Sequence, residues 1–300
     1  MQLTVDDASA PSAAAAKQPS PGGDAATDDR LTRLLAVFRD VHGGRPVMTA
    51  FSGGVDSTLV AVAARRALGR EAAPAVLGDS ASLPRRELHA ARRLAEDLDL
   101  RLIEVAPGEQ DDAGYQANAG DRCYFCKTHL YATLHRTAAE LGIDLIANGT
   151  NADDLGDHRP GLRAADEARV ISPLLEADLN KQDVRDLARL LGLPNADKPA
   201  AACLASRLPY GTPVTAQRLA QVEAAEDALH RLGFTGFRVR HHEQVARLEL
   251  PPDQFARLLE TDMQPRVIDA VKAAGYRYVA LDLEGFRSGS GNVMLTVRQT

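Results

Sequence analysis

Residues 51–57 read FSGGVDS, a polar, glycine-rich stretch between an apolar run and a segment with helical spacing. The run PVMTA before it predicts a strand, and TLVAVAARRALG after it predicts a helix. Gly53 and Gly54 carry no Cβ, so a bulky ligand group can approach their backbone, and Ser52 and Ser57 offer hydroxyls. Amide groups and the dipole at the start of the following helix favour an anion. The stretch therefore indicates a phosphate-binding turn, although a lone pair of glycines more often marks an ordinary turn.

Strand and helix patterns alternate around this turn. The apolar runs APAVLGD and LRLIEVAP flank the amphipathic pattern PRRELHAARRLAEDL, and the helix pattern TLHRTAAELGI precedes a fourth strand in DLIANGTNADD. A further helix, NKQDVRDLARLLGLP, has a start signal at Asn180 and a stop at Gly192. This alternation predicts an α/β fold, a parallel sheet with helices on both faces. Ligands of such sheets bind beyond the carboxyl ends of the strands, where FSGGVDS and NGTNADD both lie.

The pattern changes towards the C-terminus. After the long helix pattern AQRLAQVEAAEDALHRLGF, with Thr215 as its expected N-cap, the runs GFRVRHH, QVARLEL and RYVALDLEG read as strands. PPDQFARLLE and PRVIDAVKAAGY read as helices between them. We predict a tail over residues 1–30, an α/β domain over 31–205, and a smaller α+β domain over 206–300 that binds substrate and supports oligomerisation.

Composition limits the classes of protein that the chain can represent. It has 300 residues, a formal net charge of −6 and 45% hydrophobic residues, enough for a sizeable core. No apolar run approaches the ~20 residues of a membrane helix. The first 30 residues are rich in Ala, Pro, Ser, Gly and Asp and lack a secretory pattern, so we expect a disordered tail and a cytoplasmic protein. The acidic balance argues against non-specific binding to nucleic acid.

The turn SGGVDS resembles the loop that binds pyrophosphate in the PP-loop ATP pyrophosphatases. It is no Walker A loop, because GxxxxGK(S/T) is absent. The resemblance implies an enzyme that splits ATP into AMP and pyrophosphate and uses the AMP to activate a carboxylate or amide-like oxygen. Mg2+ is expected to bridge the phosphates. The residues expected at ATP are Ser52, Gly53, Gly54, Asp56, Ser57 and, from the second turn, Asp154. Asp153 is expected at the same site, or else as a cap of the following turn.

Three cysteines raise a separate question. Cys123 and Cys126 form a CxxC pair among Arg122, Lys127 and His129, surroundings that favour thiolate, and Cys203 lies in AACLASRLPYG. A zinc site normally has four ligands, so it would need His129 as well. A redox disulfide would use the pair and leave Cys203 without a role. A [4Fe-4S] cluster held by three cysteines would leave one iron open for an extra sulfide.

The ordered motifs RCYFCK, NGTNADDLGDHRPGLRAADE, SPLLE, CLASRLPYG, RVRHHEQVARLE and LDLEGFRSGS resemble the LarE family from about residue 31 to the C-terminus. The resemblance implies an ATP-dependent sulfur transferase of nickel-pincer nucleotide biosynthesis. Such enzymes adenylate the carboxylates of pyridinium-3,5-biscarboxylic acid mononucleotide and convert them to thiocarboxylates. Some members sacrifice the sulfur of a cysteine that matches Cys203. Others also carry CxxC and bind a [4Fe-4S] cluster, and this chain resembles them, with Cys123, Cys126 and Cys203 as catalytic and metal-binding residues. Homo-oligomers are implied, a hexamer among them.

The mononucleotide substrate brings a phosphate, for which the chain offers arginines. Arg238 and Arg240 lie on one face of a predicted strand, and Arg287 lies near the end of another. We predict that these three residues bind the substrate phosphate, although two arginines alone would suggest only a solvated basic face. Ser206, Arg207 and Glu226 are expected to orient the substrate. Glu223 is the alternative to Glu226 in this role, and a surface position is the alternative for both.

Other functions stay open at this stage. A tRNA thiolase would join the same ATP chemistry to cysteines, but it should carry a larger basic surface or an RNA-binding module. An NAD or GMP synthetase type of ligase would leave the three thiols unexplained. A module that senses nucleotides would bind ATP without turnover.

Overall fold

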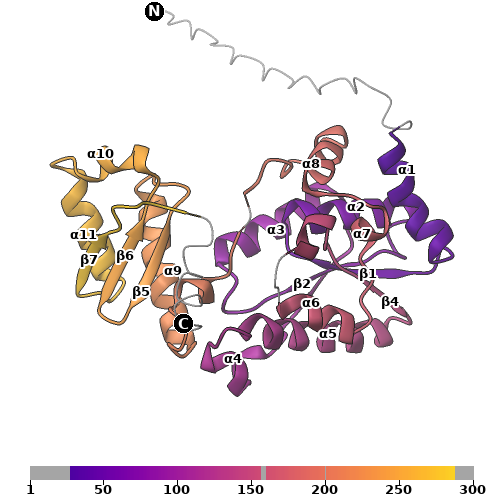
Figure 1. Ribbon diagram of the computed structural model, residues 1–300, viewed down its shortest axis with the longest axis horizontal. Helices are drawn as coiled ribbons and strands as arrows, with labels where there is room; N and C mark the ends of the chain where they lie inside the picture. Colours follow the sequence, from indigo (N-terminus) through magenta and orange to yellow (C-terminus); the bar gives the residue numbers. More distant parts are fainter. Residues whose placement is uncertain (1–27, 157–159, 200, 288–300) are drawn as a thin grey trace, which may run out of the picture.

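The computed structural model describes residues 28–156, 160–199 and 201–287, which form two sheets with their helices (Figure 1). The larger sheet contains β1 (Val47–Phe51), β2 (Ala75–Gly78), β3 (Leu102–Val105) and β4 (Leu145–Ala147) in the order β3-β2-β1-β4. All of its pairings are parallel. The parallel α/β sheet predicted from the sequence is therefore confirmed.

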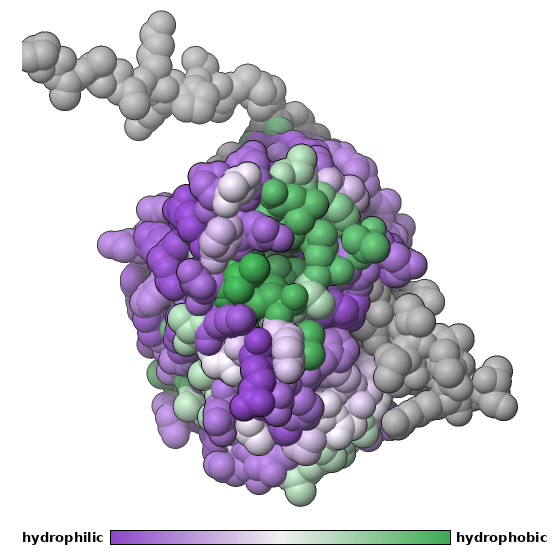
Figure 2. All heavy atoms as spheres, turned by 90° about the vertical axis from the view of Figure 1, so that its left-hand side faces the viewer, coloured by the Kyte–Doolittle hydropathy of each residue, from purple (hydrophilic) through white to green (hydrophobic). Residues whose placement is uncertain are grey.

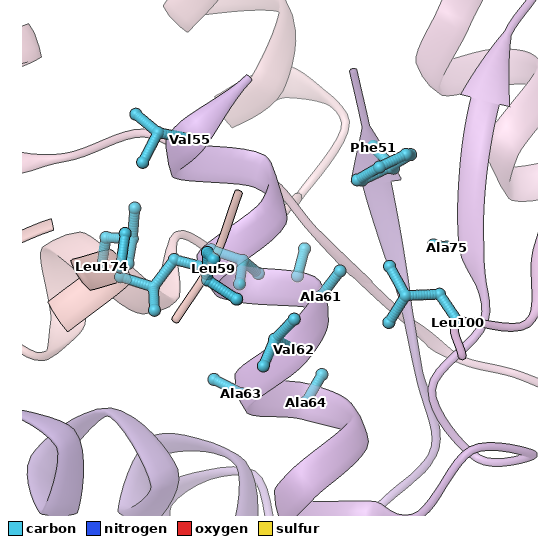
Figure 3. Close-up of a cluster of buried hydrophobic side chains, with 14 of the residues drawn as sticks. Phe51, Val55, Leu59, Ala61, Val62, Ala63, Ala64, Ala75, Leu100 and Leu174 are labelled. Carbon is cyan, nitrogen blue, oxygen red and sulfur yellow. The ribbon is translucent and has the colours of Figure 1, made fainter. Parts of the chain in front are cut away.

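Helices cover both faces of this sheet. Side chains alternate along β1, so Val47 and Phe51 join one core while Met48 joins the other. The first core includes α1 (Asp29–Ala36), α2 (Val55–Leu68), α3 (Arg85–Asp97), α7 (Pro173–Glu176) and α8 (Lys181–Leu190). The second core includes α5 (Arg122–Glu140) and α6 (Pro160–Glu167). In Figure 3, Leu59 of α2 and Phe51 of β1 belong to the first core, which fixes the turn between these elements.

Two predicted helix starts are confirmed by their caps. The side chain of Asn180 accepts a hydrogen bond from the backbone N–H of Asp183, whose carboxylate accepts one from Asn180 in return. The hydroxyl of Thr215 accepts a hydrogen bond from the backbone N–H of Arg218 at the start of α9 (Ala216–Arg231). Each cap satisfies donors that the first turn of a helix leaves unpaired.

A second, three-stranded sheet follows α9. Strand β5 (Arg238–His242) pairs antiparallel with β6 (Val245–Glu249), which pairs parallel with β7 (Tyr278–Leu281). Helices α10 (Phe255–Leu258) and α11 (Met263–Ala273) complete this unit, as the sequence predicts. The remaining short elements are η1 (Val37–Val41), η2 (Glu109–Asp111), α4 (Ala113–Ala117), η3 (Ala152–Gly156), η4 (Leu204–Arg207) and η5 (Pro252–Gln254).

The segment between the sheets packs against both units. Leu204, Leu208 and Val222 form one buried cluster with Tyr115 of α4. The carboxylate of Glu223 in α9 accepts a hydrogen bond from the backbone N–H of Arg85, the first residue of α3. The carboxylate thus caps a helix of the first sheet from the second unit. The domain boundary near residue 206 stays a prediction.

One element differs from its prediction. The sequence pattern predicts a helix over 133–143, but α5 already begins at Arg122. The partly buried Tyr124, two turns before Tyr131, packs in the same core as Tyr131, Leu134 and Ala138, so packing extends the helix over the motif. Cys123 and Cys126 therefore lie at positions i and i+3 near the start of a helix, on one of its faces.

The surface of the second unit carries apolar side chains. Leu259, Tyr278 and Leu283 are exposed there, and Figure 2 shows hydrophobic residues gathered on the face that this unit presents. No helix in the described part of the chain is both long and apolar enough to cross a membrane.

Candidate active site

The turn after β1 is held in one conformation by its own hydroxyls. The hydroxyl of Ser57 donates to the carbonyl of Gly54 at 3.1 Å and accepts from the backbone N–H of Ser52 at 3.1 Å. Gly53 has φ +70°, and a Cβ there would lie 2.9 Å from the Cβ of Ala91 in α3. Conformation and space therefore both require glycine at position 53.

The second polar turn meets the first, as the sequence predicts. A Cβ on Gly149 would lie 2.8 Å from the backbone nitrogen of Ser57, so the turn after β4 packs on the start of α2. The carboxylate of Asp56 accepts hydrogen bonds from Nδ2 of Asn151 at 3.1 Å and from Nζ of Lys181 at 2.5 Å. Both turns thus share one network at the carboxyl ends of β1 and β4.

A cavity of about 860 Å³ opens from these turns. Ser52, Gly54, Asp56, Ser57, Asp153, Asp154 and Lys181 line its polar end. Val76, Leu130, Tyr131 and Leu162 line an apolar part, and Cys123, Lys127 and Tyr210 line it as well. Cavities of this size, mostly apolar with a few placed polar groups, commonly hold small-molecule ligands and cofactors. The phosphate turn and one thiol of the CxxC pair therefore face the same space.

The two aspartates of the second turn have distinct local roles. Asp153 accepts a hydrogen bond from the backbone N–H of Lys181 at 3.0 Å, so it caps α8 rather than the turn that follows it. Asp154 accepts one from the backbone N–H of Asn151 at 3.1 Å. Both carboxylates line the cavity, where they would also be available to Mg2+ brought by ATP.

Sequence reasoning missed two residues of this site. Lys181 follows the N-cap of α8 and looks like an ordinary surface lysine in the sequence, yet its ammonium group reaches Asp56. Asn195 is buried, and its Nδ2 donates to the carbonyl of Gly53 at 3.1 Å and to the hydroxyl of Thr58 at 2.9 Å. Both residues reach the turn after β1 because α8 and the loop after it pack against that turn. No pattern in the neighbouring sequence predicts this packing.

The three cysteines lie around the start of α5. Cys123 is exposed, whereas Cys126 and Cys203 are half-buried beside the same cluster, which includes Tyr115. Burial raises the pKa of Cys126 to about 12, so the expectation that its surroundings favour thiolate is wrong for this thiol. The prediction overlooked desolvation, which outweighs the charge of Lys127. His129 forms a hydrogen bond with Asp112 at 3.0 Å.

The three thiols are the donor set that the chain offers to an iron–sulfur cluster. Across residues 28–156, 160–199 and 201–287, no three His, Cys, Asp or Glu side chains are arranged as a set that could hold a metal ion. The residues around the three cysteines nevertheless have the chemistry that an anionic metal–sulfur group needs. The three thiols are free, and the buried hydroxyl of Tyr115 has no hydrogen-bond partner within the described part of the chain.

The segment after Cys203 is anchored to the second unit. The hydroxyl of Ser206 donates to the carbonyl of Cys203 at 2.7 Å. The guanidinium of Arg207 makes two hydrogen bonds to Glu226, at 2.9 and 3.1 Å, and both side chains are buried. Glu226 also accepts from the backbone N–H of Val239 at 3.0 Å. The alternative of a surface position for Glu226 is therefore wrong, because α9 turns this carboxylate towards β5.

The predicted phosphate-binding arginines fall into different environments. Arg240 is buried, lies 3.0 Å from the carboxylate of Glu249 and donates to the carbonyl of Ser206 at 2.7 Å. Arg238 is half-buried, and its guanidinium carbon lies 4.9 Å from the ring centroid of Phe286. Burial, with the charges of Arg207 and Arg240, lowers the pKa of Arg238. Arg287 is exposed and pairs with Glu284.

Histidines of the second unit give stability a pH dependence. Burial lowers the pKa values of His230 and His241 below their ordinary value of 6.5. The fold therefore favours neutral imidazoles, so their stabilising contribution is complete above pH ~6.5 and is lost as the pH falls below it. We expect the urea midpoint to drop between pH 7.5 and 5. His241→Gln should reduce that drop, whereas replacement of the exposed His89 should not; an equal drop in all three proteins would contradict the assignment.

Comparison with known proteins agrees with this site. A family model described as NAD synthase matches residues 34–125. The chain is 43% identical to an uncharacterized protein of Synechocystis, over 90% of this chain and 99% of the relative. It is 41% identical to pyridinium-3,5-bisthiocarboxylic acid mononucleotide synthase of Lactiplantibacillus plantarum, over 89% of this chain and 95% of the relative.

A more distant relative is one of the subunits of the glutamine-hydrolyzing GMP synthase of Methanoculleus marisnigri, 29% identical over 63% of this chain and 62% of the relative. The near-complete match at 41% identity is much the stronger of these two likenesses to proteins of named activity. The chain therefore belongs to the LarE family of pyridinium-3,5-bisthiocarboxylic acid mononucleotide synthases, within the PP-loop ATP pyrophosphatases.

Proposed function

We propose that the protein is an ATP-dependent sulfur transferase. It adenylates the carboxylates of pyridinium-3,5-biscarboxylic acid mononucleotide, releases pyrophosphate and AMP, and leaves thiocarboxylates. The observation that carries the proposal is the single cavity that contains the phosphate turn, the acidic second turn and Cys123. A relative named as a pyridinium-3,5-bisthiocarboxylic acid mononucleotide synthase, matched over 95% of its length, supports the choice of product.

The chain's own groups suit the first half-reaction. A carboxylate is a poor electrophile, and its acyl-adenylate gives a far better leaving group. The hydroxyls and amides of Ser52, Gly54 and Ser57 face the cavity at the positive end of α2, where ATP phosphates would be stabilised. Lys181 adds a positive charge at the same end. Asp153 and Asp154 would hold Mg2+ together with phosphate oxygens.

We propose that Cys123, Cys126 and Cys203 hold a [4Fe-4S] cluster, which would supply the transferred sulfur when bound. The free thiols and the unpartnered hydroxyl of Tyr115 support this assignment. The alternative is that Cys203 gives up its own sulfur atom to the activated carboxylate. The two routes differ in whether Cys123 and Cys126 are required.

Arg238 is the better candidate for binding the substrate phosphate, because Arg240 is buried and already paired with the carboxylate of Glu249. We expect Arg238→Ala to weaken mononucleotide binding by about 1.5–3 kcal/mol, because a charge-assisted hydrogen bond is lost, and to leave ATP binding unchanged. Arg240→Ala would leave Glu249 buried without this partner and should destabilise the fold by roughly 3 kcal/mol or more. Calorimetry with each ligand and thermal melting separate the two effects, with exposed Arg231→Ala as the control. Wild-type mononucleotide affinity in Arg238→Ala would reject this phosphate site.

We further propose a cytoplasmic homo-oligomer, a hexamer being the form that the family suggests. The reduced thiols suit a reducing compartment, and the exposed Leu259, Tyr278 and Leu283 on the second unit are suited to contacts between copies. The partner in catalysis is the small mononucleotide.

Release of pyrophosphate tests the substrate class. With ATP and Mg2+ present, we expect release to depend on added pyridinium-3,5-biscarboxylic acid mononucleotide and to be absent with bulk tRNA or with xanthosine monophosphate. Release that depends on tRNA would instead indicate a thiolase of RNA, and release with xanthosine monophosphate would indicate a GMP synthetase type of ligase.

A further inference from the structure

The start of α5 contains a buried positive charge with an unusual environment. Three arginines of the described chain are buried: Arg122, Arg207 and Arg240. Arg207 is paired with the carboxylate of Glu226, and Arg240 with that of Glu249. Among the described residues, Arg122 has no carboxylate partner, and its Nη1 donates only to neutral oxygens of Asn118 and, at 2.8 Å, of Ala205. A buried guanidinium is costly unless an anion compensates its charge.

Arg122 lies between the two segments that carry the cysteines. The hydrogen bond to Ala205 places the guanidinium at the segment that follows Cys203, while Cys123 is its neighbour in the chain. The guanidinium thus joins the two segments that carry the three thiols.

A second polar group lies in the buried cluster beside Cys126 and Cys203. The side chain of Tyr115 is 1% exposed, and its hydroxyl lies near that of Ser82 but forms no hydrogen bond of ordinary geometry within the described residues. A phenol is neutral near pH 7, so its hydroxyl can donate a hydrogen bond. A buried hydroxyl that lacks an acceptor is rare in a folded protein and calls for one.

We propose that Arg122 and Tyr115 form the anion-binding side of the sulfur site, and that they stabilise an anionic centre made of cysteine sulfur and inorganic sulfide. Arg122 compensates the charge, and the hydroxyl of Tyr115 donates a hydrogen bond to a sulfur atom. This inference rests on the proposed sulfur centre. It adds two residues that stabilise the centre without ligating it. Lys127 has a different role, because it is exposed and lines the cavity towards the ATP turn.

Two substitutions test the inference, each with a matched control. Tyr115→Phe removes only the hydroxyl, and Arg122→Gln removes the charge while keeping a donor. The control for the first is Tyr276→Phe, which removes a buried hydroxyl that does have a partner, His241 at 3.1 Å. The control for the second is Arg136→Gln, at an exposed site of the same helix. Each protein is purified without air, melted in its metal-free form, and then loaded with ferrous iron and sulfide.

In metal-free protein we expect Tyr115→Phe to melt no lower than wild type, because its hydroxyl has no partner to lose, and Tyr276→Phe to melt lower. After loading, Tyr115→Phe and Arg122→Gln should retain iron and sulfide about tenfold less tightly against a chelator, the effect typical of groups that support metal ligands from outside. Both should also lower the reduction potential of the loaded centre. The two controls should retain iron as wild type does.

Wild-type iron retention and potential in both variants would overturn the inference. So would metal-free Tyr115→Phe that melts as low as Tyr276→Phe, since the hydroxyl would then serve the fold. If wild-type protein itself retains no iron, the proposed cluster is wrong and the inference is wrong with it. Pyrophosphate release, measured alongside, reports on adenylation and shows whether that part of the proposed function stands.

Discussion

Asp56→Ala and Ser57→Ala should each lower pyrophosphate release by about 100-fold, the loss typical when a group that stabilises developing charge is removed. Asp56 fixes both Asn151 and Lys181 at the polar end of the cavity, so its loss frees the ammonium group from its place. Ser57 closes the turn through hydrogen bonds to Ser52 and Gly54, and its loss leaves the N–H of Ser52 without that acceptor.

The fold should survive both changes. The ion pair of Asp56 and Lys181 is partly exposed, so its removal should cost at most about 1 kcal/mol of stability. The matched control is Asp29→Ala, which removes an exposed ion pair with Arg33 far along the chain from the turn. If both site variants melt at the wild-type temperature and release pyrophosphate at the wild-type rate, residues 52–57 are not the ATP turn.

Replacement of any one cysteine should stop sulfur transfer without stopping adenylation. If Cys123, Cys126 and Cys203 hold one cluster, each Cys→Ala variant should lose iron and thiocarboxylate formation together, because two remaining ligands hold a cluster poorly. Pyrophosphate release should continue, because the ATP turn depends on other elements. Iron and sulfide analysis, product mass spectrometry and pyrophosphate release are measured on the same samples, with Thr128→Ala on the exposed side of α5 as the control.

The sacrificial route makes the opposite prediction. Cys123→Ala would then transfer sulfur normally, and the mass of the protein would fall by one sulfur and its hydrogens as position 203 becomes dehydroalanine. Unchanged protein mass after several turnovers, together with inactive Cys123→Ala, would support the cluster.

The sequence predicts those features of the fold that follow from short-range patterns. The alternation of apolar runs and helical patterns indicates the parallel sheet, and Asn180 and Thr215 mark helix starts that the structure confirms. The start of α5 is missed although Asp121, a favoured N-cap residue, precedes it, because the polar residues that follow interrupt the apolar stripe that marks a helix. Packing of Tyr124 against the second core accompanies the early start.

The site is predicted where it is built from contiguous turns, and it is missed where distant segments complete it. The two turns at the ends of β1 and β4 are found, but Lys181 and Asn195 reach them from the region of α8. Burial is the other quantity that a pattern does not give. It raises the pKa of Cys126 and places Arg240 against Glu249, neither of which residue type alone reveals.

The most direct test of the proposed activity is the mass of the product. Wild-type protein, purified without air, is given ATP, Mg2+, sulfide and pyridinium-3,5-biscarboxylic acid mononucleotide, and the nucleotide is analysed by mass spectrometry together with AMP. We expect carboxylate oxygen to be replaced by sulfur, with AMP formed in step and no product when ATP is omitted. An unchanged mononucleotide, in a protein that still consumes ATP with another acceptor, would contradict the account.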